Sequence, residues 1–289
     1  MKIKLSAVER AASDALIKAS TSYTPDQLKA FEEAIKNERN KNARWIFEQI
    51  IENAAIAEKK KLPLCDDTGI PHVLLEIGKE AELDGNIGSL FTSINNGISH
   101  GLRSLPGRPM AVRGNDFERI AQSKGLYEDP GMLLPAPIRV KQVDGKAIRL
   151  TVLMLGGGPE IRSRTYRIFH HHTITKVQQQ IAKWAVELAR LLGCTPCVPA
   201  IGIGRTHYEA ASLVLEAMAN KQFGRENEME RYITAELNKS DIGALGLGGT
   251  ITALNTFIEI GPQRASGVRI VSLRIGCLVD PRKYSIILD

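Results

Sequence analysis

The sequence is poor in aromatic residues and has no long apolar run. Aromatic residues make up 5% of the 289 residues, so little material is present for stacking nucleic-acid bases. The basic residues behind the net charge of +6 are spread along the chain. We therefore expect no nucleic-acid partner, while an anionic small molecule stays possible as a ligand. No apolar stretch approaches the roughly 20 residues that cross a bilayer, and the first residues lack the apolar core of a signal peptide. These absences predict a cytoplasmic protein without a membrane partner.

The glycine-rich segments lack complete nucleotide-binding motifs. Residues 202–204 (GIG) lack the third glycine of a dinucleotide fingerprint, and Gly249 stands where a phosphate-binding loop over residues 243–250 requires lysine. The glycines instead permit tight turns with positive φ. Such loops can still present backbone N–H groups to an anion or a cofactor.

Only four cysteines occur, Cys65, Cys194, Cys197 and Cys277, too few for a disulfide scaffold. Cys194 and Cys197 have the spacing of a redox dithiol or of half a zinc site. No second pair completes the zinc site, and the pair follows a predicted helix, whereas a reactive dithiol begins one. Cys65, Cys197 and Cys277 stay as candidates, each in a loop marked by glycine or proline. Their spacing alone favours three unrelated buried thiols over three ligands of an iron–sulfur cluster with one open iron.

The chain is organised around residues 61–71, where four consecutive positions carry a thiol, two carboxylates and a hydroxyl: Cys65, Asp66, Asp67 and Thr68. Proline and glycine around them predict a loop. A thiolate is a soft metal ligand and a carboxylate can serve as acid or base. The alternative is a helix-terminating turn with solvated aspartates.

Periodicity and turn residues predict an α+β fold in a single domain over residues 1–289, with a mainly helical portion (1–60) and an α/β portion (61–289). The α/β portion is expected to hold a mixed or antiparallel sheet flanked by helices. Thr24, Pro25 and Gln27 predict a helix start with a capping box. Asp144-Gly145 predicts a hairpin between residues 138–143 and 146–155. Further expected elements are a strand over 73–78, helices over 86–102, 174–191, 207–220 and 226–238, and a strand over 268–275. His170–His172 are expected in a solvated loop.

Several blocks, in this order, resemble class I fumarate hydratase and L(+)-tartrate dehydratase, the iron–sulfur hydro-lyases. Residues 63–69 (PLCDDTG) are similar to that family's Pro-x-Cys-Gln-Asp-Thr-Gly, and residues 156–160 (GGGPE) to its Gly-Gly-Gly-Ser-Glu. Residues 196–204 resemble its Pro-Cys-Pro-Pro and glycine repeat. Residues 246–254 (GLGGTITAL) match closely, and Cys277 stands where the last ligand belongs. The resemblance is to the α subunit, or N-terminal domain.

The resemblance implies that Cys65, Cys197 and Cys277 bind a 4Fe-4S cluster from loops and that Cys194 is a spectator. It implies that Asp67 binds substrate and transfers a proton, that Arg103 contacts a substrate carboxylate, and that Asp66, Gly157 and Gly158 also face the substrate. The expected activity is reversible hydration of a small dicarboxylate such as fumarate, in a hetero-oligomer with a β subunit. A tartrate-like hydroxy acid is the alternative substrate, and a non-catalytic iron–sulfur or zinc-binding protein is the alternative function.

Two departures from the family pattern concern the substrate. Asp66 replaces the family's glutamine, and residues 110–120 replace its Asn-Thr-Gly-Asp-Asn segment. A carboxylate at position 66 would meet an anionic substrate as a like charge. Either Asp66 is protonated, or a basic residue such as Arg103 or Arg113 compensates its negative charge. Otherwise the substrate differs at that point, or Asp66 turns away and pairs locally.

Overall fold

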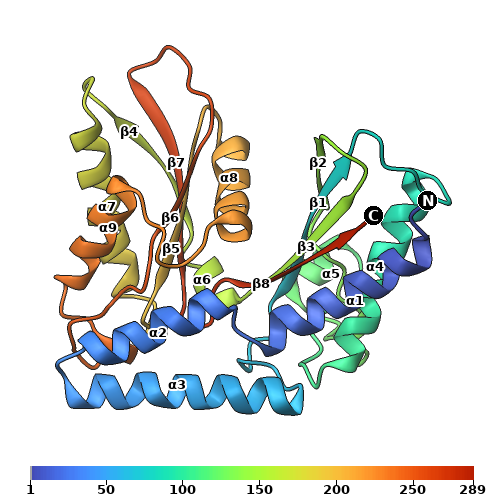
Figure 1. Cartoon of the computed structure of the whole chain (residues 1–289), viewed down its shortest axis with the longest axis horizontal. Helices are drawn as coiled ribbons and strands as arrows, with labels where there is room; N and C mark the ends of the chain where they lie inside the picture. The colour runs from blue at the N-terminus through green and yellow to red at the C-terminus, as the bar shows by residue number, and fades with distance from the viewer. Residues whose placement is uncertain (1) are drawn as a thin grey trace. The chain divides into compact units, whose positions relative to one another are not determined.

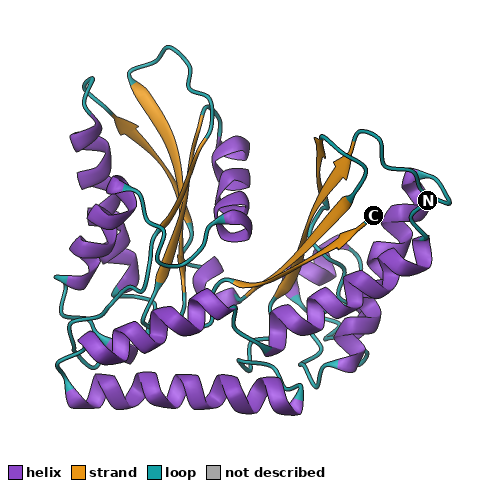
Figure 2. Ribbon diagram, viewed as in Figure 1, coloured by secondary structure: helices purple, strands orange, loops and turns teal. Residues whose placement is uncertain are grey.

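A computed structural model describes residues 2–289, which form two compact units, each assembled from segments far apart in the sequence (Figure 1). Unit 1 combines the N-terminal stretch up to Ser22 with Ala54–Gly156 and Arg282–Asp289, and unit 2 combines Tyr23–Asn53 with Gly157–Pro281. Each unit contains one sheet and flanking helices (Figure 2). The predicted α+β class is confirmed, and the single domain expected over residues 1–289 stays a prediction.

The sheet of unit 1 has four strands in the order β2-β1-β3-β8. Strand β1 (Ile70–Gly78) runs parallel to β2 (Arg139–Val143) and antiparallel to β3 (Ile148–Leu155), and β3 pairs antiparallel with β8 (Arg282–Leu288). The predicted hairpin is therefore wrong, because β1 lies between β2 and β3. The Asp144-Gly145 turn does form, with Gly145 at φ +102°. It crosses the end of β1, where the Lys79 and Glu80 amides donate to the Val143 and Gly145 carbonyls.

Two helices, α1 (Leu5–Thr21) and α4 (Ile87–Ser104), pack side by side and cover this sheet (Figure 1). The Asn86 side chain caps α4 by accepting from the Ser89 amide. Gly97 lets the helices approach, because a Cβ there would lie 2.1 Å from the Glu9 carbonyl oxygen. Their apolar faces bury a core that includes Leu16, Ile94 and Leu150. The long connection that follows holds only α5 (Asp116–Ala121) and a short 3-10 turn, η1 (Pro130–Met132).

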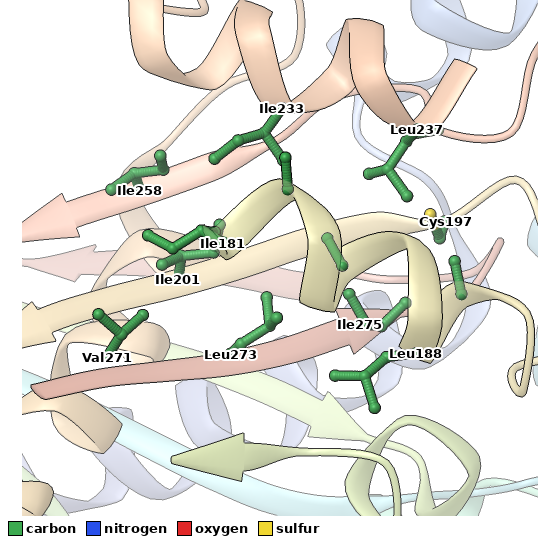
Figure 3. Packing of buried hydrophobic residues seen from close by; sticks show 14 of the residues in the cluster. Ile181, Leu188, Cys197, Ile201, Ile233, Leu237, Ile258, Val271, Leu273 and Ile275 are labelled. Atoms are coloured by element: carbon green, nitrogen blue, oxygen red, sulfur yellow. The ribbon is translucent and has the colours of Figure 1, made fainter. Parts of the chain in front are cut away.

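The sheet of unit 2 has the order β4-β7-β5-β6. Its strands are β4 (Arg164–Phe169), β5 (Val198–Gly204), β6 (Phe257–Ile260) and β7 (Val268–Gly276). The helices α7 (Ile174–Ala189) and α9 (Glu228–Asn238) lie on one side of the sheet and α8 (His207–Asn220) on the other (Figure 1). Figure 3 shows α7 and α9 side chains packed over β5, β6 and β7, with Cys197 at one end of the cluster. The remaining short elements are α6 (Gly157–Glu160) and η2 (Ala244–Gly246).

Two helices complete the fold, α2 (Pro25–Asn37) and α3 (Lys41–Lys60), and the residues of α3 are divided between the two units. The predicted start of α2 is confirmed, but the capping box is wrong. Thr24 has extended backbone and makes no side-chain cap bond. The Gln27 side chain is buried and donates instead to the Asp280 carbonyl oxygen at 3.0 Å. A tertiary partner has replaced the local one.

Among residues 2–289, no helix combines the length and the apolar character that a membrane crossing requires.

Candidate functional site

The predicted loop after α3 is confirmed, and it presents Cys65, Asp66 and Asp67 in unit 1. The chain leaves the helix at Lys61 (φ +53°) and enters β1 through Gly69 (φ +83°). Leu64 anchors the loop, because its side chain is buried and its amide donates to the Ser20 carbonyl at 2.9 Å. Cys65 is then half-buried and Asp66 exposed.

A buried arginine that the sequence reasoning missed lies behind this loop. Arg282, the first residue of β8, is 2% exposed. Its Nη1 donates to the carbonyl oxygens of Asp67 (2.7 Å) and Thr68 (3.2 Å). A Cβ on Gly156 would lie 2.8 Å from Asp67 Oδ2 and 3.2 Å from Arg282 Nη2. The structure therefore gathers the Asp67 carboxylate, a guanidinium and a side-chain-free position around one point.

The charge of Arg282 also acts on the neighbouring thiol. Burial raises the pKa of Cys65, and a hydrogen bond and the negative charge of Asp66 raise it further. A hydrogen bond from the Asp67 backbone and, next, the positive charge of Arg282 oppose that shift, but the pKa stays raised. The site therefore contains a cation that favours the thiolate, the form in which cysteine binds a metal.

Asp66 pairs with Arg108, which is neither of the two arginines considered from the sequence. The guanidinium Nη2 of Arg108 lies 3.2 Å from Asp66 Oδ2, and its Nε donates to the Asp66 carbonyl at 3.0 Å. The Arg108 amide donates to Thr68 Oγ1 at 3.0 Å. Arg113 is engaged elsewhere, with its Nε donating to the Lys124 carbonyl at 3.1 Å. A local pair thus balances the Asp66 carboxylate, which is the last of the alternatives expected from the sequence.

Arg103, near the end of α4, is held by Asp129. Its Nε and Nη2 donate to the two carboxylate oxygens at 3.0 and 2.8 Å. This hydrogen bonding raises the pKa of Arg103 and lowers that of Asp129. Gly131 closes in on the pair, because a Cβ there would lie 2.7 Å from Arg103 Nε. The side chain is therefore held in one direction by a bidentate contact.

The sheet register of unit 2 brings two of the three candidate cysteines together. Val198 in β5 pairs with Gly276 in β7, and Cys197 precedes the first of these residues while Cys277 follows the second. Both cysteines therefore stand at the same end of these neighbouring strands, one residue beyond their last pair. Cys197 is buried and Cys277 partly buried, whereas Cys194, the expected spectator, is exposed. Burial raises the pKa of Cys197 to about 12.

A glycine-rich loop over residues 243–250 belongs to the same end of unit 2. The Thr195 hydroxyl accepts from the Gly246 amide at 3.1 Å and donates to the Gly243 carbonyl. A Cβ on Gly243 (φ +64°) would lie 2.0 Å from the Gly248 backbone. These contacts hold the loop beside the segment that contains Cys194 and Cys197, and they explain why glycine is required there.

A second buried ionisable residue that the sequence reasoning missed, Glu38, fixes the far end of this loop. It is 1% exposed. Its carboxylate accepts from the Asn40 amide, from the amide and hydroxyl of Thr250, and from the Ile251 amide, at 2.8–3.1 Å. Burial alone raises the pKa of Glu38, but these hydrogen bonds outweigh it and lower the pKa. Only its charge, just after a helix, could have drawn attention to it in the sequence.

Gly157 and Gly158 lie in the one-turn helix α6, and nothing lies within 4 Å of a Cβ built on Gly158. The neighbouring Glu160 carboxylate lies 3.5 Å from Arg274 Nε, and Arg274 Nη1 donates to Asp280 Oδ2 at 2.9 Å. The same Asp280 oxygen accepts from the Cys277 amide at 3.1 Å. The backbone of Cys277 is therefore fixed by a buried ion pair.

Across residues 2–289, no group of three or more histidine, cysteine, aspartate or glutamate side chains is gathered closely enough to hold a metal ion.

The predicted solvated loop at residues 170–172 is wrong for its first member, because His170 is buried. Its Nε2 lies 2.8 Å from the Ser266 carbonyl oxygen, and its Nδ1 accepts from the His172 amide at 2.9 Å. Both ring nitrogens of His170 are thus used within the fold.

Comparison with known proteins identifies the family. The model of the family "Fumarate hydratase (Fumerase)" matches residues 9–286. The chain is 30% identical over 271 residues to the "Putative L(+)-tartrate dehydratase subunit alpha" of Methanocaldococcus jannaschii, covering 92% of this chain and 91% of that protein. It is 24% identical over 263 residues to "Fumarate hydratase class I, anaerobic" of Escherichia coli, covering 84% of this chain and 44% of that enzyme. The match to "Fumarate hydratase 2" of Leishmania major is also 24%, over 278 residues and 46% of that enzyme.

The chain therefore belongs to the fumarate hydratase (fumerase) family, which confirms the resemblance found in the sequence. Within that family it is a hydro-lyase of the class I fumarate hydratase and tartrate dehydratase α type. It spans less than half the length of the fumarate hydratases it matches.

Proposed function

We propose that this chain is the α subunit of an iron–sulfur hydro-lyase that reversibly adds water to a small dicarboxylate. Membership of the family supports the reaction class. The observation that supports the proposal is the register between β5 and β7, because its last pair, Val198 and Gly276, is flanked by Cys197 and Cys277 in a chain of this family.

The family is known to use an iron–sulfur cluster, and the donors of this chain suit a 4Fe-4S group. By the resemblance found in the sequence, we propose that Cys65, Cys197 and Cys277 hold it, since thiolates are the usual ligands of such clusters. The Asp280 side chain, which fixes the Cys277 backbone, keeps its buried Oδ1 without a hydrogen-bond partner in the described structure. That acceptor requires a donor or a cation, and cluster sulfides are neither, so the fit is carried by the three thiolates. When bound, the cluster supplies a Lewis-acidic iron.

The remaining roles are proposed for Asp67, Arg103, Gly157 and Gly158, as the resemblance implies. We assign the proton transfer to Asp67, whose carboxylate lies beside the Arg282 guanidinium and the bare Gly156. Arg103, directed by Asp129, is assigned to a substrate carboxylate. Gly157 and Gly158 leave room for the substrate, because neither carries a side chain.

The names of the relatives support the proposed partner and substrate. The Methanocaldococcus relative is described as a subunit alpha, so we propose a β subunit as partner in a hetero-oligomer. The Escherichia coli fumarate hydratase that this chain matches is more than twice as long as the matched region. The rest of that enzyme is long enough to hold the counterpart of a β subunit. The substrate is fumarate and malate, or a tartrate-like hydroxy acid, as the names of these relatives suggest.

Anaerobic purification with the β-type partner tests the proposal. The sample should be brown, with broad absorbance and acid-labile sulfide, and should turn over L(+)-tartrate or fumarate. A cluster without turnover of either acid would favour the alternative of a non-catalytic iron–sulfur protein. Bound zinc without labile sulfide would favour the zinc-binding alternative.

Single Cys→Ser variants test the ligand assignment. Substitution of Cys65, Cys197 or Cys277 should abolish the iron–sulfur absorbance, since each removes one thiolate ligand. Cys194→Ser is the matched control and should keep it. Equal loss in the Cys194 variant would instead support a paired site formed by Cys194 and Cys197.

A further inference from the structure

Arg274 is a buried arginine near the end of β7, three residues before Cys277, and none of the roles proposed above uses it. Its side chain is 3% exposed, and its Nη1 donates to Asp280 Oδ2 at 2.9 Å. The Asp280 side chain is 2% exposed. Apolar side chains of similar volume often replace a buried ion pair without loss of folding stability, because they avoid the desolvation of two charges. Folding stability alone therefore does not explain this pair.

The pair is joined directly to the backbone of Cys277. The Asp280 oxygen that accepts from Arg274 also accepts from the Cys277 amide at 3.1 Å. Gly276 makes this close approach possible, because a Cβ there would lie 2.9 Å from the Asp280 Cβ and 2.6 Å from the Val198 carbonyl oxygen. Arg274 thus holds Asp280 in place, and Asp280 in turn holds the amide of the proposed ligand.

The charge of Arg274 also acts on Cys277 and on the one-turn helix α6. Glu160 belongs to that helix, and its Oε2 lies 3.5 Å from Arg274 Nε. Burial lowers the pKa of Arg274, whereas the charge and the hydrogen bond of Asp280 raise it. The negative charges of Cys277 and Glu160 add to that effect, and the pKa of Arg274 is raised overall. A permanent positive charge at this place therefore offsets the negative charge of a thiolate at Cys277.

We infer that Arg274 and Asp280 form a positioning pair for the proposed cluster ligand Cys277. Asp280 orients the backbone of the ligand, while Arg274 fixes Asp280 and places a positive charge near the thiolate. Groups that surround the ligands of a metal site orient those ligands, and net charge and hydrogen bonds set the reduction potential of an iron–sulfur cluster. The inference rests on the proposed function, because it takes Cys277 as a ligand of the cluster.

The test uses the chain purified anaerobically with its β-type partner and loaded with its cluster, as wild type and as four variants. Arg274→Met removes the charge, and Arg274→Lys keeps it. The double variant Arg274→Met with Asp280→Leu removes both charges, so it leaves no buried charge unpaired if Arg274→Met alone fails to fold. Arg269→Met is the control, because Arg269 lies in the same strand and donates to backbone carbonyls of preceding residues.

Two quantities are measured for every protein. One is the midpoint reduction potential of the cluster, followed by electron paramagnetic resonance in a redox titration. The other is the rate at which the iron–sulfur absorbance is lost in air. Neither measurement needs turnover of a substrate.

Arg274→Met should lower the equilibrium constant for one-electron reduction by roughly tenfold, which is about 59 mV, because a nearby positive charge is lost. Arg274→Lys should bring this constant back to within about threefold of the wild type, since the charge is restored. The double variant should keep a similar potential, because two opposite charges are removed together, but it should lose its cluster about tenfold faster than the control. The control should match the wild type in both measurements.

A potential in Arg274→Met equal to that of the control, or cluster loss in the double variant at the rate of the control, would overturn the inference. If Arg274→Met does not fold, the rate of cluster loss in the double variant decides. A wild type that holds a cluster but converts neither L(+)-tartrate nor fumarate would refute the proposed activity and leave the comparison of potentials valid. A wild type without acid-labile sulfide would overturn the inference together with the ligand assignment.

Discussion

Arg282→Met removes a buried guanidinium and keeps most of the side-chain volume. Two acceptors in the loop, the carbonyl oxygens of Asp67 and Thr68, then lose the donor that lies 2.7 and 3.2 Å away. A buried acceptor left without its partner costs about 1–3 kcal/mol. Part of that cost is returned because a charge no longer has to be buried. We expect unit 1 to lose about 2–4 kcal/mol.

The measurement is hydrogen–deuterium exchange and urea unfolding of the full, cluster-free chain. The control is Arg149→Met, because Arg149 makes an ion pair with Glu76 at 3.3 Å and its side chain is 38% exposed. A pair of that kind contributes about 0.5 kcal/mol or less. Exchange should accelerate most in residues 62–70 of the Arg282 variant. Equal losses in the two variants, within about 0.5 kcal/mol, would refute the reasoning that Arg282 supports the loop.

Three other predictions concern unit 2. Glu38→Gln should cost about 2–4 kcal/mol, because an amide cannot accept from both of its ends. The folded-state pKa of Glu38 is lowered from 4.5, so its contribution to the free energy of unfolding is present above that pH and is lost as the pH falls through the lower value. Urea unfolding at several pH values should therefore give free energies of unfolding that converge in acid for the wild type and Glu38→Gln. A difference that stays constant with pH would contradict this. Gly243→Ala should disrupt the loop over residues 243–250, because its Cβ would lie 2.0 Å from backbone atoms. The control Gly246→Ala has a positive φ but open space around its Cβ, so it should cost about 1–2 kcal/mol. Calorimetric melting compares the two variants, and equal melting temperatures would argue against the close approach at Gly243. In the native, cluster-free chain, iodoacetamide at about pH 8 should label the exposed Cys194. Cys197 is buried and its pKa is about 12, so it should stay unlabelled until the chain is unfolded. Mass spectrometry identifies the labelled thiol, and fast labelling of Cys197 would show that its burial is incomplete.

The helices and the central loop could be predicted because their signals are local. The apolar periodicity from Ile174 onward corresponds to α7, and proline and glycine bound the loop at residues 61–71 as expected. The sheet partner of β2 could not be predicted in the same way. Asp144-Gly145 does form a turn, but a turn signal carries no information on whether another strand enters between the two that it connects. Strand β1, from far upstream, occupies that place.

The residues of the candidate site also differ in whether a local sequence signal marks them. The cysteines, Asp67 and Arg103 were found through blocks of sequence, and their roles stay proposals. Arg282 and Glu38 had no such signal, because the loops that they hold lie more than 200 residues away in the chain. The partner of Asp66 was missed for a related reason. Arg108 stands in an irregular segment, and its contact with the Asp66 carboxylate joins residues 42 positions apart, which no local pattern encodes.

The interleaved segments of the two units have a consequence for how the protein is made. Unit 1 lacks a sheet strand until Arg282–Leu288 has been synthesised, because β8 pairs with β3 and brings Arg282 to the loop. At roughly 5–20 residues per second, a ribosome needs several seconds or more to translate the residues between Gly156 and Arg282. During that time β3 is an unpaired sheet edge, which is prone to pair with other chains. Nascent chains of this protein should therefore depend on chaperones most strongly while unit 2 is being translated.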